Sequence, residues 1–299
     1  MIYNNLSGYL KEKYGKKIKK ICIDGGFSCP NRDGTCGLGG CIFCGERGAG
    51  EHITGGRMSV SDQVRDFFSK NPKGDGFIAY FQNFTNTYAP VDVLKARYDA
   101  ALIDERIVAL AIGTRPDCIT EEIARLIASY RDKCDVWVEL GLQTANDQTA
   151  KLINRGYMCE TFAKSVSILH AHDIPVVVHM IIGLPGEGIE DIRETVRFIN
   201  QFDLWGIKIH SIYVMKGTAL ERLYLQNAYE PPTMDEYISG AAYTLAHISP
   251  KMVVHRLTGD CPKDLLVAPA WNPQKNDVLN RIVRQMEDNG WVQGCMFEA

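Results

Sequence analysis

Several features that would set this chain apart from ordinary globular proteins are missing from its sequence. No apolar run approaches the ~18 residues needed to cross a bilayer, and the richest stretch, Val176 to Leu184, is interrupted by His179 and Gly183. The N-terminus lacks a basic segment followed by an apolar one, so no secretory signal is predicted. We therefore expect a cytoplasmic protein that does not enter a membrane.

An excess of charge of either sign is also missing, because 33 basic residues face 36 acidic ones. Bulk charge therefore gives no argument for nucleic-acid binding. The hydrophobic fraction of 45% and the charged fraction of 23% are ordinary, which excludes a disordered chain or a coiled coil. Locally, six lysines lie between residues 11 and 20. Such a run is typical of a solvated face, and it is also compatible with a patch that contacts phosphates.

Nucleotide-binding fingerprints are absent as well, since neither G-x-G-x-x-G nor G-x-x-x-x-G-K-[ST] occurs. What stands out instead is a cluster of cysteines. Four of the ten cysteines, Cys29, Cys36, Cys41 and Cys44, lie within sixteen residues, while the others are scattered and are predicted to be small buried side chains. A reducing compartment argues against disulfides. The cluster therefore predicts a metal site.

The spacing of these cysteines leaves two kinds of metal site open. An eleven-residue spacer separates Cys29 from Cys41, and Cys41-Ile-Phe-Cys44 is a C-x-x-C unit. Thiolates suit either zinc or iron–sulfur. Four cysteines could close a structural zinc site; alternatively, three could hold a 4Fe–4S cluster whose fourth iron stays open. Cys36 is the ambiguous member.

Strand-like and helix-like segments alternate along most of the chain. Apolar strands are expected at 18–23, 77–82, 107–112, 136–140, 175–182, 206–212 and 253–255, and amphipathic helices at 60–68, 90–101, 120–130, 147–153, 160–172, 190–202 and 234–246, with a last helix ending near 288. The pattern predicts an α/β fold with a parallel sheet buried on both faces, made of six βα-like units and a C-terminal extension. We expect a basic N-terminal segment at 1–20, the main unit at 21–230 and the extension at 231–299.

Polar residues recur where these strands end. In barrels of parallel strands, reactive groups lie at the carboxyl ends of the strands. The predicted rim comprises the cysteine segment, Gln82, Asn83, Thr85, Asn86, Arg115, Asp117, Glu139, Gln143, Gly183 to Glu187, and His210. Six elements that contribute to one rim favour a single functional site.

Several of these segments together resemble a known family. They are Phe27-Ser-Cys-Pro-Asn-Arg-Asp-Gly-Thr, Gly39-Gly-Cys-Ile-Phe-Cys, Ala79-Tyr-Phe-Gln-Asn-Phe-Thr-Asn-Thr-Tyr-Ala-Pro, Ile112-Gly-Thr-Arg-Pro-Asp-Cys, Glu139-Leu-Gly-Leu-Gln-Thr-Ala and His255-Arg-Leu-Thr-Gly-Asp. From about residue 3 to residue 280 the chain resembles the YhcC/YtqA-type radical-SAM proteins, stand-alone relatives of the Elongator catalytic subunit. The resemblance implies a partial (β/α)6 TIM-type barrel with a C-terminal α/β extension.

The same resemblance implies a 4Fe–4S cluster held by Cys29, Cys41 and Cys44, with Cys36 left out, and S-adenosylmethionine bound at the open iron. Reductive cleavage of the sulfonium would then yield a 5′-deoxyadenosyl radical. The implied contacts to S-adenosylmethionine are Gln82, Asn86, Glu139, Gln143, Arg155 and His179. Two positions depart from related enzymes, since Gly113 stands where strand three usually has Glu, and His179 stands where strand five usually has Asp.

Kinship with the Elongator subunit implies tRNA as the substrate, with remodelling of the C5 substituent of the wobble uridine, for example carboxymethylaminomethyl to aminomethyl. The lysine-rich N-terminus would contact RNA phosphates. Expected substrate-binding residues are Lys216, His210, His255 and Arg256, with Lys208 and Asp260 as further candidates. An electron donor of flavodoxin or ferredoxin type is expected. The alternatives are radical chemistry on a small molecule or a protein, and a zinc-stabilised RNA-binding protein without catalysis.

Overall fold

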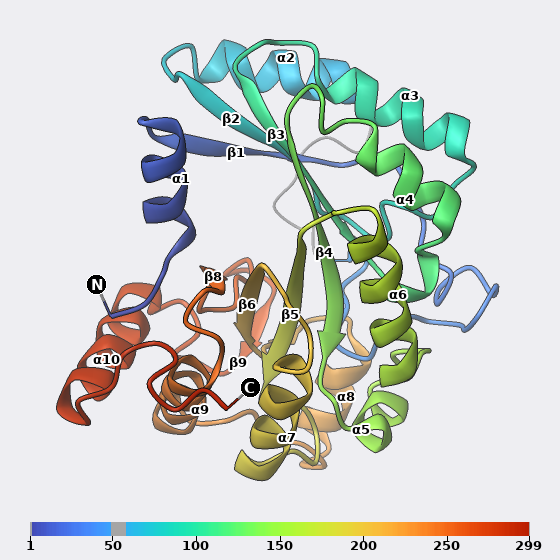
Figure 1. The fold of residues 1–299 in the computed structure, drawn as a ribbon. Helices are drawn as coiled ribbons and strands as arrows, with labels where there is room; N and C mark the ends of the chain where they lie inside the picture. The colour runs from blue at the N-terminus through green and yellow to red at the C-terminus, as the bar shows by residue number, and fades with distance from the viewer. Residues whose placement is uncertain (1, 49–57, 299) are drawn as a thin grey trace.

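A curved sheet of seven parallel strands organises the molecule (Figure 1). The computed structural model describes residues 2–48 and 58–298. In spatial order the strands are β1 (Ile18–Ile23), β2 (Gly76–Phe81), β3 (Ile107–Thr114), β4 (Asp135–Gln143), β5 (Val176–Ile182), β6 (Gly206–Ser211) and β8 (Val253–Arg256). Because every neighbouring pair is parallel, all carboxyl ends meet at one rim of this incomplete barrel.

Helices cover the outer face of the sheet (Figure 1). They are α2 (Val60–Lys70), α3 (Val91–Ala101), α4 (Glu121–Ala128), α6 (Cys159–Ala171), α7 (Ile189–Ile199) and α9 (Met234–His247), with α10 (Lys275–Asp288) packed on α9. Several begin at a side-chain cap, as at Thr120, whose hydroxyl accepts from the Ile123 N–H, and at Thr233. Shorter elements, the 3-10 turn η1 (Pro116–Cys118), α5 (Asp147–Leu152) and α8 (Ala219–Leu225), follow strands near the rim.

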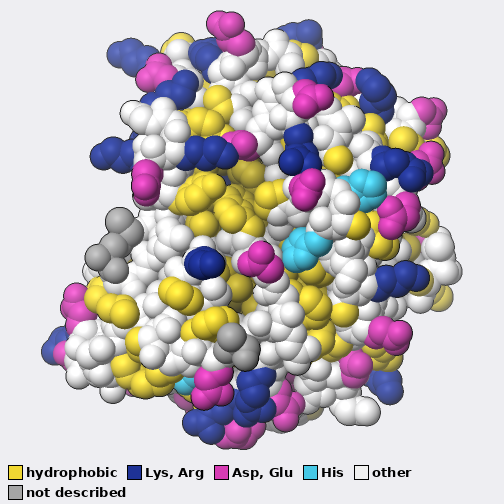
Figure 2. All heavy atoms as spheres, viewed as in Figure 1, with side chains coloured by type: hydrophobic (Ala, Val, Ile, Leu, Met, Phe, Trp, Pro, Cys, Tyr) yellow, Lys and Arg dark blue, Asp and Glu magenta, His cyan; other side chains and the backbone are white. Residues whose placement is uncertain are grey.

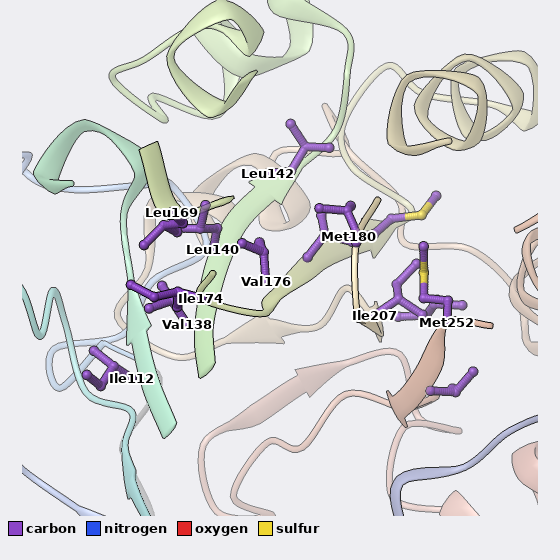
Figure 3. Close-up of a cluster of buried hydrophobic side chains, with 14 of the residues drawn as sticks. Ile112, Val138, Leu140, Leu142, Leu169, Ile174, Val176, Met180, Ile207 and Met252 are labelled. Carbon is purple, nitrogen blue, oxygen red and sulfur yellow. The ribbon is translucent and has the colours of Figure 1, made fainter. Parts of the chain in front are cut away.

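The main hydrophobic core lies between the sheet and these helices. Figure 3 shows strand residues such as Val138, Leu140 and Val176 grouped with Leu169 of α6. These side chains are fully buried, as the near-continuous apolar strands predict for a parallel sheet covered by helices.

The inner face of the sheet is closed at the amino ends of the strands by α1 (Leu6–Tyr14). Leu6 and Leu10 of this helix pack against Ile78, Trp137 and Val177 of the strands. The same inner face carries polar side chains further toward the carboxyl ends of the strands, and these form part of the site described below.

The predicted α/β partial barrel is confirmed, and the strand expected at 253–255 pairs with β6 as the seventh strand of the sheet. Helices α1 and α8, and the antiparallel pair β7 (Val214–Met215) and β9 (Leu266–Ala268), were not predicted. Figure 2 shows acidic and basic side chains interspersed over the visible face. No helix within the described residues combines the length and the apolar character that a membrane span requires.

Candidate functional site

Three of the clustered cysteines lie on the loop between β1 and α2. Cys29, Cys41 and Cys44 are free and partly exposed. The Cys44 N–H donates to the Cys41 carbonyl at 3.0 Å, which closes a tight turn. A hydrogen bond between the two thiols lowers the pKa of Cys41 and, together with burial, raises the pKa of Cys44. Cys41 and Cys44 therefore place two thiols side by side on one loop, where both could bind the same metal centre.

Neighbouring segments hold this cysteine loop in place. The Ile42 N–H donates to the Ile153 carbonyl at 3.0 Å, and the Ile42 carbonyl accepts from Leu220 of α8 at 2.8 Å. Asn31 donates to the Asn154 carbonyl at 2.6 Å, and Asn154 donates to the Gly40 carbonyl at 2.8 Å. Sequence reasoning missed Asn31 and Asn154, whose amides fix a backbone that has little regular structure of its own.

Cys36 points to other partners. Its sulfur lies 3.6 Å from a guanidinium nitrogen of Arg115 and 3.8 Å from Asp117 Oδ2, and these two residues form an ion pair of 2.6 Å. Within residues 2–48 and 58–298, no three His, Cys, Asp or Glu side chains are assembled as a metal site. This holds equally for Cys29, Cys41 and Cys44, so it does not separate the two kinds of metal site. The contacts of Cys36 with Arg115 and Asp117 leave the other three thiols as the donor set, and three thiols suit iron–sulfur.

Unpaired acceptor atoms surround the cysteine loop. The side-chain oxygens of Asn31, Asn83, Thr85 and Asn86 are buried and have no hydrogen-bond partner among the described residues. The amide of Asn86 is fixed by donation to the Gly113 carbonyl at 2.7 Å. Because buried acceptors are normally satisfied, this arrangement fits a ligand that brings N–H or O–H groups. Asn86 lies where the sequence placed it, next to the cysteine loop through the Thr85 N–H to Ser28 carbonyl bond of 3.2 Å.

Gln82 follows β2 directly, and its N–H donates to the Ile23 carbonyl at 3.4 Å. Its side chain is partly exposed at the rim. This placement brings it to the same end of the sheet as the cysteine loop, as the sequence predicts for a residue that follows a parallel strand.

Arg155 is the largest fully buried side chain among the residues that the structure describes. Its guanidinium donates to the carbonyls of Leu142, Thr144 and Tyr157 and contacts Asp147 at 3.3 Å. These bonds tie the end of β4 to the segment before α6. Any contact from Arg155 to a cofactor would require one of these bonds to be exchanged, so the contact with S-adenosylmethionine implied by the sequence stays a prediction.

Gln143 ends β4 with φ of 63°, a left-handed conformation that costs a non-glycine residue free energy. Its Oε1 accepts from Tyr157 at 3.2 Å, and Tyr157 also donates to the Gly141 carbonyl at 2.6 Å. Such strain is concentrated at functional sites in proteins. Gln143 therefore remains a good candidate for ligand contact.

A buried charge network crosses the inside of the barrel at Glu139. Its carboxylate accepts from Tyr80 at 2.8 Å, from Trp137 at 3.2 Å and from His179 at 2.9 Å, and it forms an ion pair with Lys208. Burial opposes ionisation, but Lys208 and the histidines outweigh it and hold the pKa of Glu139 well below its usual range. Burial lowers the pKa of Lys208 to about 7. The alternation of inward and outward side chains could have located Tyr80 and Trp137 on the inner face, although sequence reasoning missed both.

The structure brings only some of the expected substrate residues to this network. His210 packs beside His179, with ring centroids 5.4 Å apart, and Nδ1 of the fully buried His255 lies 3.8 Å from Glu139. Burial and the positive charge of Arg256 lower the pKa of His210. Lys216 instead donates to the Asp264 carbonyl at 2.7 Å, and Asp260 forms an ion pair with Lys275. The expected set therefore divides into an inner group around Glu139 and an outer group near the C-terminal segment.

Two lysines of the N-terminal run lie at the amino ends of the strands, whereas Lys20 of β1 lies over the ring of Tyr80, 5.1 Å from its centroid. Lys13 pairs with Asp135, the first residue of β4, and Lys16 donates to the Asp75 carbonyl just before β2. These residues are at the amino ends of the strands, whereas the cysteine loop follows the carboxyl end of β1. The predicted contact of these lysines with RNA phosphates stays a prediction, and this placement would put it at the opposite end of the strands from the cysteine loop.

Glu187, in the glycine-rich turn after β5, carries an unusual carboxyl. It accepts from Thr144, and burial raises its pKa to about 7. Between pH 4.5 and 7 the folded state binds more protons at Glu187 than the unfolded state does, so this carboxyl makes stability fall as pH rises through that range.

We expect Glu187→Gln, which keeps an acceptor for Thr144, to match the wild type in Tm at pH 5 and to exceed it at pH 8. Thermal unfolding with Glu190→Gln, an exposed neighbour, as the control measures this; equal pH profiles for wild type and Glu187→Gln would contradict it.

Comparisons with known proteins agree with this geometry. The sequence model of the Radical SAM superfamily matches residues 33–199, and that of the Radical_SAM C-terminal domain matches residues 204–288. YtqA of Bacillus subtilis is 38% identical over 99% of this chain and 93% of its own length, and YhcC of Escherichia coli is 33% identical over 98% and 94%.

More distant relatives match only in part. The tRNA uridine(34) acetyltransferase of Methanocaldococcus infernus is 30% identical to this chain. The matched region covers 64% of this chain and 35% of that protein. Among solved structures, the archaeal Elp3 of the same organism, with an N-terminal deletion, aligns with a TM-score of 0.70 at 19% identity, over 92% of this chain and 64% of that one. At this identity the alignment shows a shared fold.

Proposed function

This chain belongs to the radical SAM superfamily, and from that membership we propose that it is a radical S-adenosylmethionine enzyme acting on a uridine of tRNA. Members of the superfamily bind a 4Fe–4S cluster and S-adenosylmethionine. When bound together, these two groups supply a 5′-deoxyadenosyl radical that removes a hydrogen atom from a substrate. The protein contributes placement and the exclusion of water.

The residues of this chain fit that pair of cofactors. Cys29, Cys41 and Cys44 are free thiols on one loop and would hold the cluster. Asn83 and Asn86 lie in the segment after β2, which is bonded to the start of the cysteine loop through Thr85 and Ser28. Their unpaired side-chain oxygens would accept from the amino group of the methionine moiety. Gln82, Gln143 and Arg155 remain proposed contacts to S-adenosylmethionine, and Arg155 would have to exchange one of its hydrogen bonds to backbone carbonyls to make this contact. We do not retain Glu139, because its side chain is fully enclosed, and we assign His179 to the substrate for the reasons given below.

One observation carries the choice of tRNA: the similarity to a tRNA uridine(34) acetyltransferase over 64% of this chain. We propose that the substrate is the C5 substituent of the wobble uridine, and the specific change to seek is carboxymethylaminomethyl to aminomethyl. His210 and Arg256 remain proposed contacts to an unstacked base, whereas His255 is fully enclosed beside Trp137 and Trp205 and would act only through Glu139. A flavodoxin- or ferredoxin-type protein is the proposed electron donor.

The test is mass spectrometry of tRNA nucleosides from cells with and without the gene, complemented either by the wild type or by Cys41→Ala. We expect one C5-substituted uridine to disappear and its precursor to accumulate, with restoration by the wild type only. An unchanged nucleoside profile would reject tRNA and favour a small-molecule or protein substrate instead.

A further inference from the structure

His179 is held in one orientation by the buried carboxylate of Glu139. Its Nε2 lies 2.9 Å from Glu139 Oε2. Tyr80 and Trp137 also donate to that carboxylate, and Lys208 pairs with it. An ionised carboxylate can only accept hydrogen bonds, so Nε2 of His179 must carry the proton in this pair.

The other nitrogen of the ring is then a free acceptor. No described residue hydrogen-bonds to Nδ1 of His179, and that atom is absent from the set of buried unpaired atoms that includes both nitrogens of His255. The His179 side chain keeps 21% of its surface exposed, whereas Glu139 is fully enclosed. A neutral imidazole with Nε2 protonated therefore presents a lone pair to the inside of the barrel.

The charged groups around His179 keep this ring neutral. Lys208 and His210 face it from β6, Arg256 acts on it from β8, and Glu139 faces it from β4. Burial and the two cations lower the pKa of His179, and Glu139 only partly offsets them. A cationic ligand would be repelled here, whereas a neutral N–H or O–H would be accepted.

His179 lies on β5 and contacts Glu139 of β4 and His210 of β6. The cysteine loop follows β1, which is four strands away from β5 in the order of the sheet. We propose that His179 is a specificity residue for the substrate, whose Nδ1 accepts a hydrogen bond from a neutral N–H or O–H of the bound nucleoside and whose tautomer is set by Glu139. This inference rests on the proposed function, because it takes a nucleoside as the substrate.

The test uses the reconstituted full chain with ¹⁵N-labelled histidine. Side-chain NMR is expected to show His179 as the Nε2–H tautomer at neutral pH, with both tautomers populated in Glu139→Gln. Millimolar 5-carboxymethylaminomethyluridine should shift the Nδ1 signal of His179, and S-adenosylmethionine alone should not. A shift with S-adenosylmethionine only would make His179 a cofactor contact, and a shift with neither probe would reject a ligand role; either result overturns the proposal.

His179→Gln supplies a second measurement, since a glutamine amide can still donate to Glu139 but offers no acceptor at the Nδ1 position. We expect the KM for tRNA to rise about tenfold, the size of one lost hydrogen bond to substrate, while 5′-deoxyadenosine release without substrate stays within twofold of wild type. The matched control is His172→Gln, because His172 makes a similar 2.8 Å contact to Glu121 on the surface. Equal loss of both activities, or no change in either, would contradict a substrate role. Failure of the tRNA proposal itself would appear separately, as an unchanged nucleoside profile in the deletion strain.

Discussion

Replacing any one of Cys29, Cys41 and Cys44 with alanine is expected to abolish iron loading and to reduce 5′-deoxyadenosine release by more than about 100-fold. This loss exceeds the roughly 10- to 100-fold effect of removing a residue that only orients a metal ligand. The three thiols are free and lie on one loop, so each replacement removes one of the three ligands proposed for the cluster. Iron content, the visible absorbance of anaerobically reconstituted protein and chromatography of the nucleoside product measure the outcome.

Cys36→Ala is the matched control, because Cys36 lies on the same loop but contacts Arg115 and Asp117. We expect this variant to keep its iron and its cleavage of S-adenosylmethionine. If it lost metal as completely as Cys41→Ala did, or if the wild-type protein bound zinc and stayed colourless, the four-cysteine alternative would be correct and the proposed chemistry would be wrong.

The sheet could be predicted from the sequence because its strands are short apolar runs separated by amphipathic helices. The first strand was predicted with its observed bounds, 18–23, and the strand at 206–212 ends one residue earlier in the structure. Helix α1 was missed because its lysines dominate the pattern, and only Leu6 and Leu10 are buried. Its position could have been inferred, since residues that immediately precede a strand lie at the amino end of that strand.

The site was predictable in its location but only partly in its contacts. Residues that follow parallel strands gather at one rim, so the sequence could place Gln82, Asn86 and Gln143 near the cysteine loop. The sequence could not show that the guanidinium N–H groups of Arg155 donate to backbone carbonyls, because this depends on how the turn after α5 folds back on β4. It also could not show that Glu139 is enclosed by donors from four strands.

That enclosure leads to the second large expected effect. Glu139→Ala should lower the free energy of unfolding by about 3–5 kcal/mol, the range for removing one partner of a buried ion pair. The loss leaves Lys208 almost fully buried, with Tyr80 as its remaining hydrogen-bond partner. Urea denaturation at neutral pH measures the change, and Glu121→Ala is the control, because its pairing with His172 is exposed and is expected to contribute less than about 1 kcal/mol.

The double variant Glu139→Leu with Lys208→Met separates the cost of an unpaired charge from the loss of favourable contacts. Removing both charges takes away the buried lysine that destabilises Glu139→Ala, so at least half of the lost stability should return. Full recovery is not expected, because Tyr80, Trp137 and His179 lose the acceptor that they share. A double variant as unstable as Glu139→Ala would show that the hydrogen bonds to the carboxylate, rather than its charge pairing with Lys208, stabilise the inside of the barrel. A Glu139→Ala variant no less stable than Glu121→Ala would show that the network contributes little to folding and is maintained for binding alone.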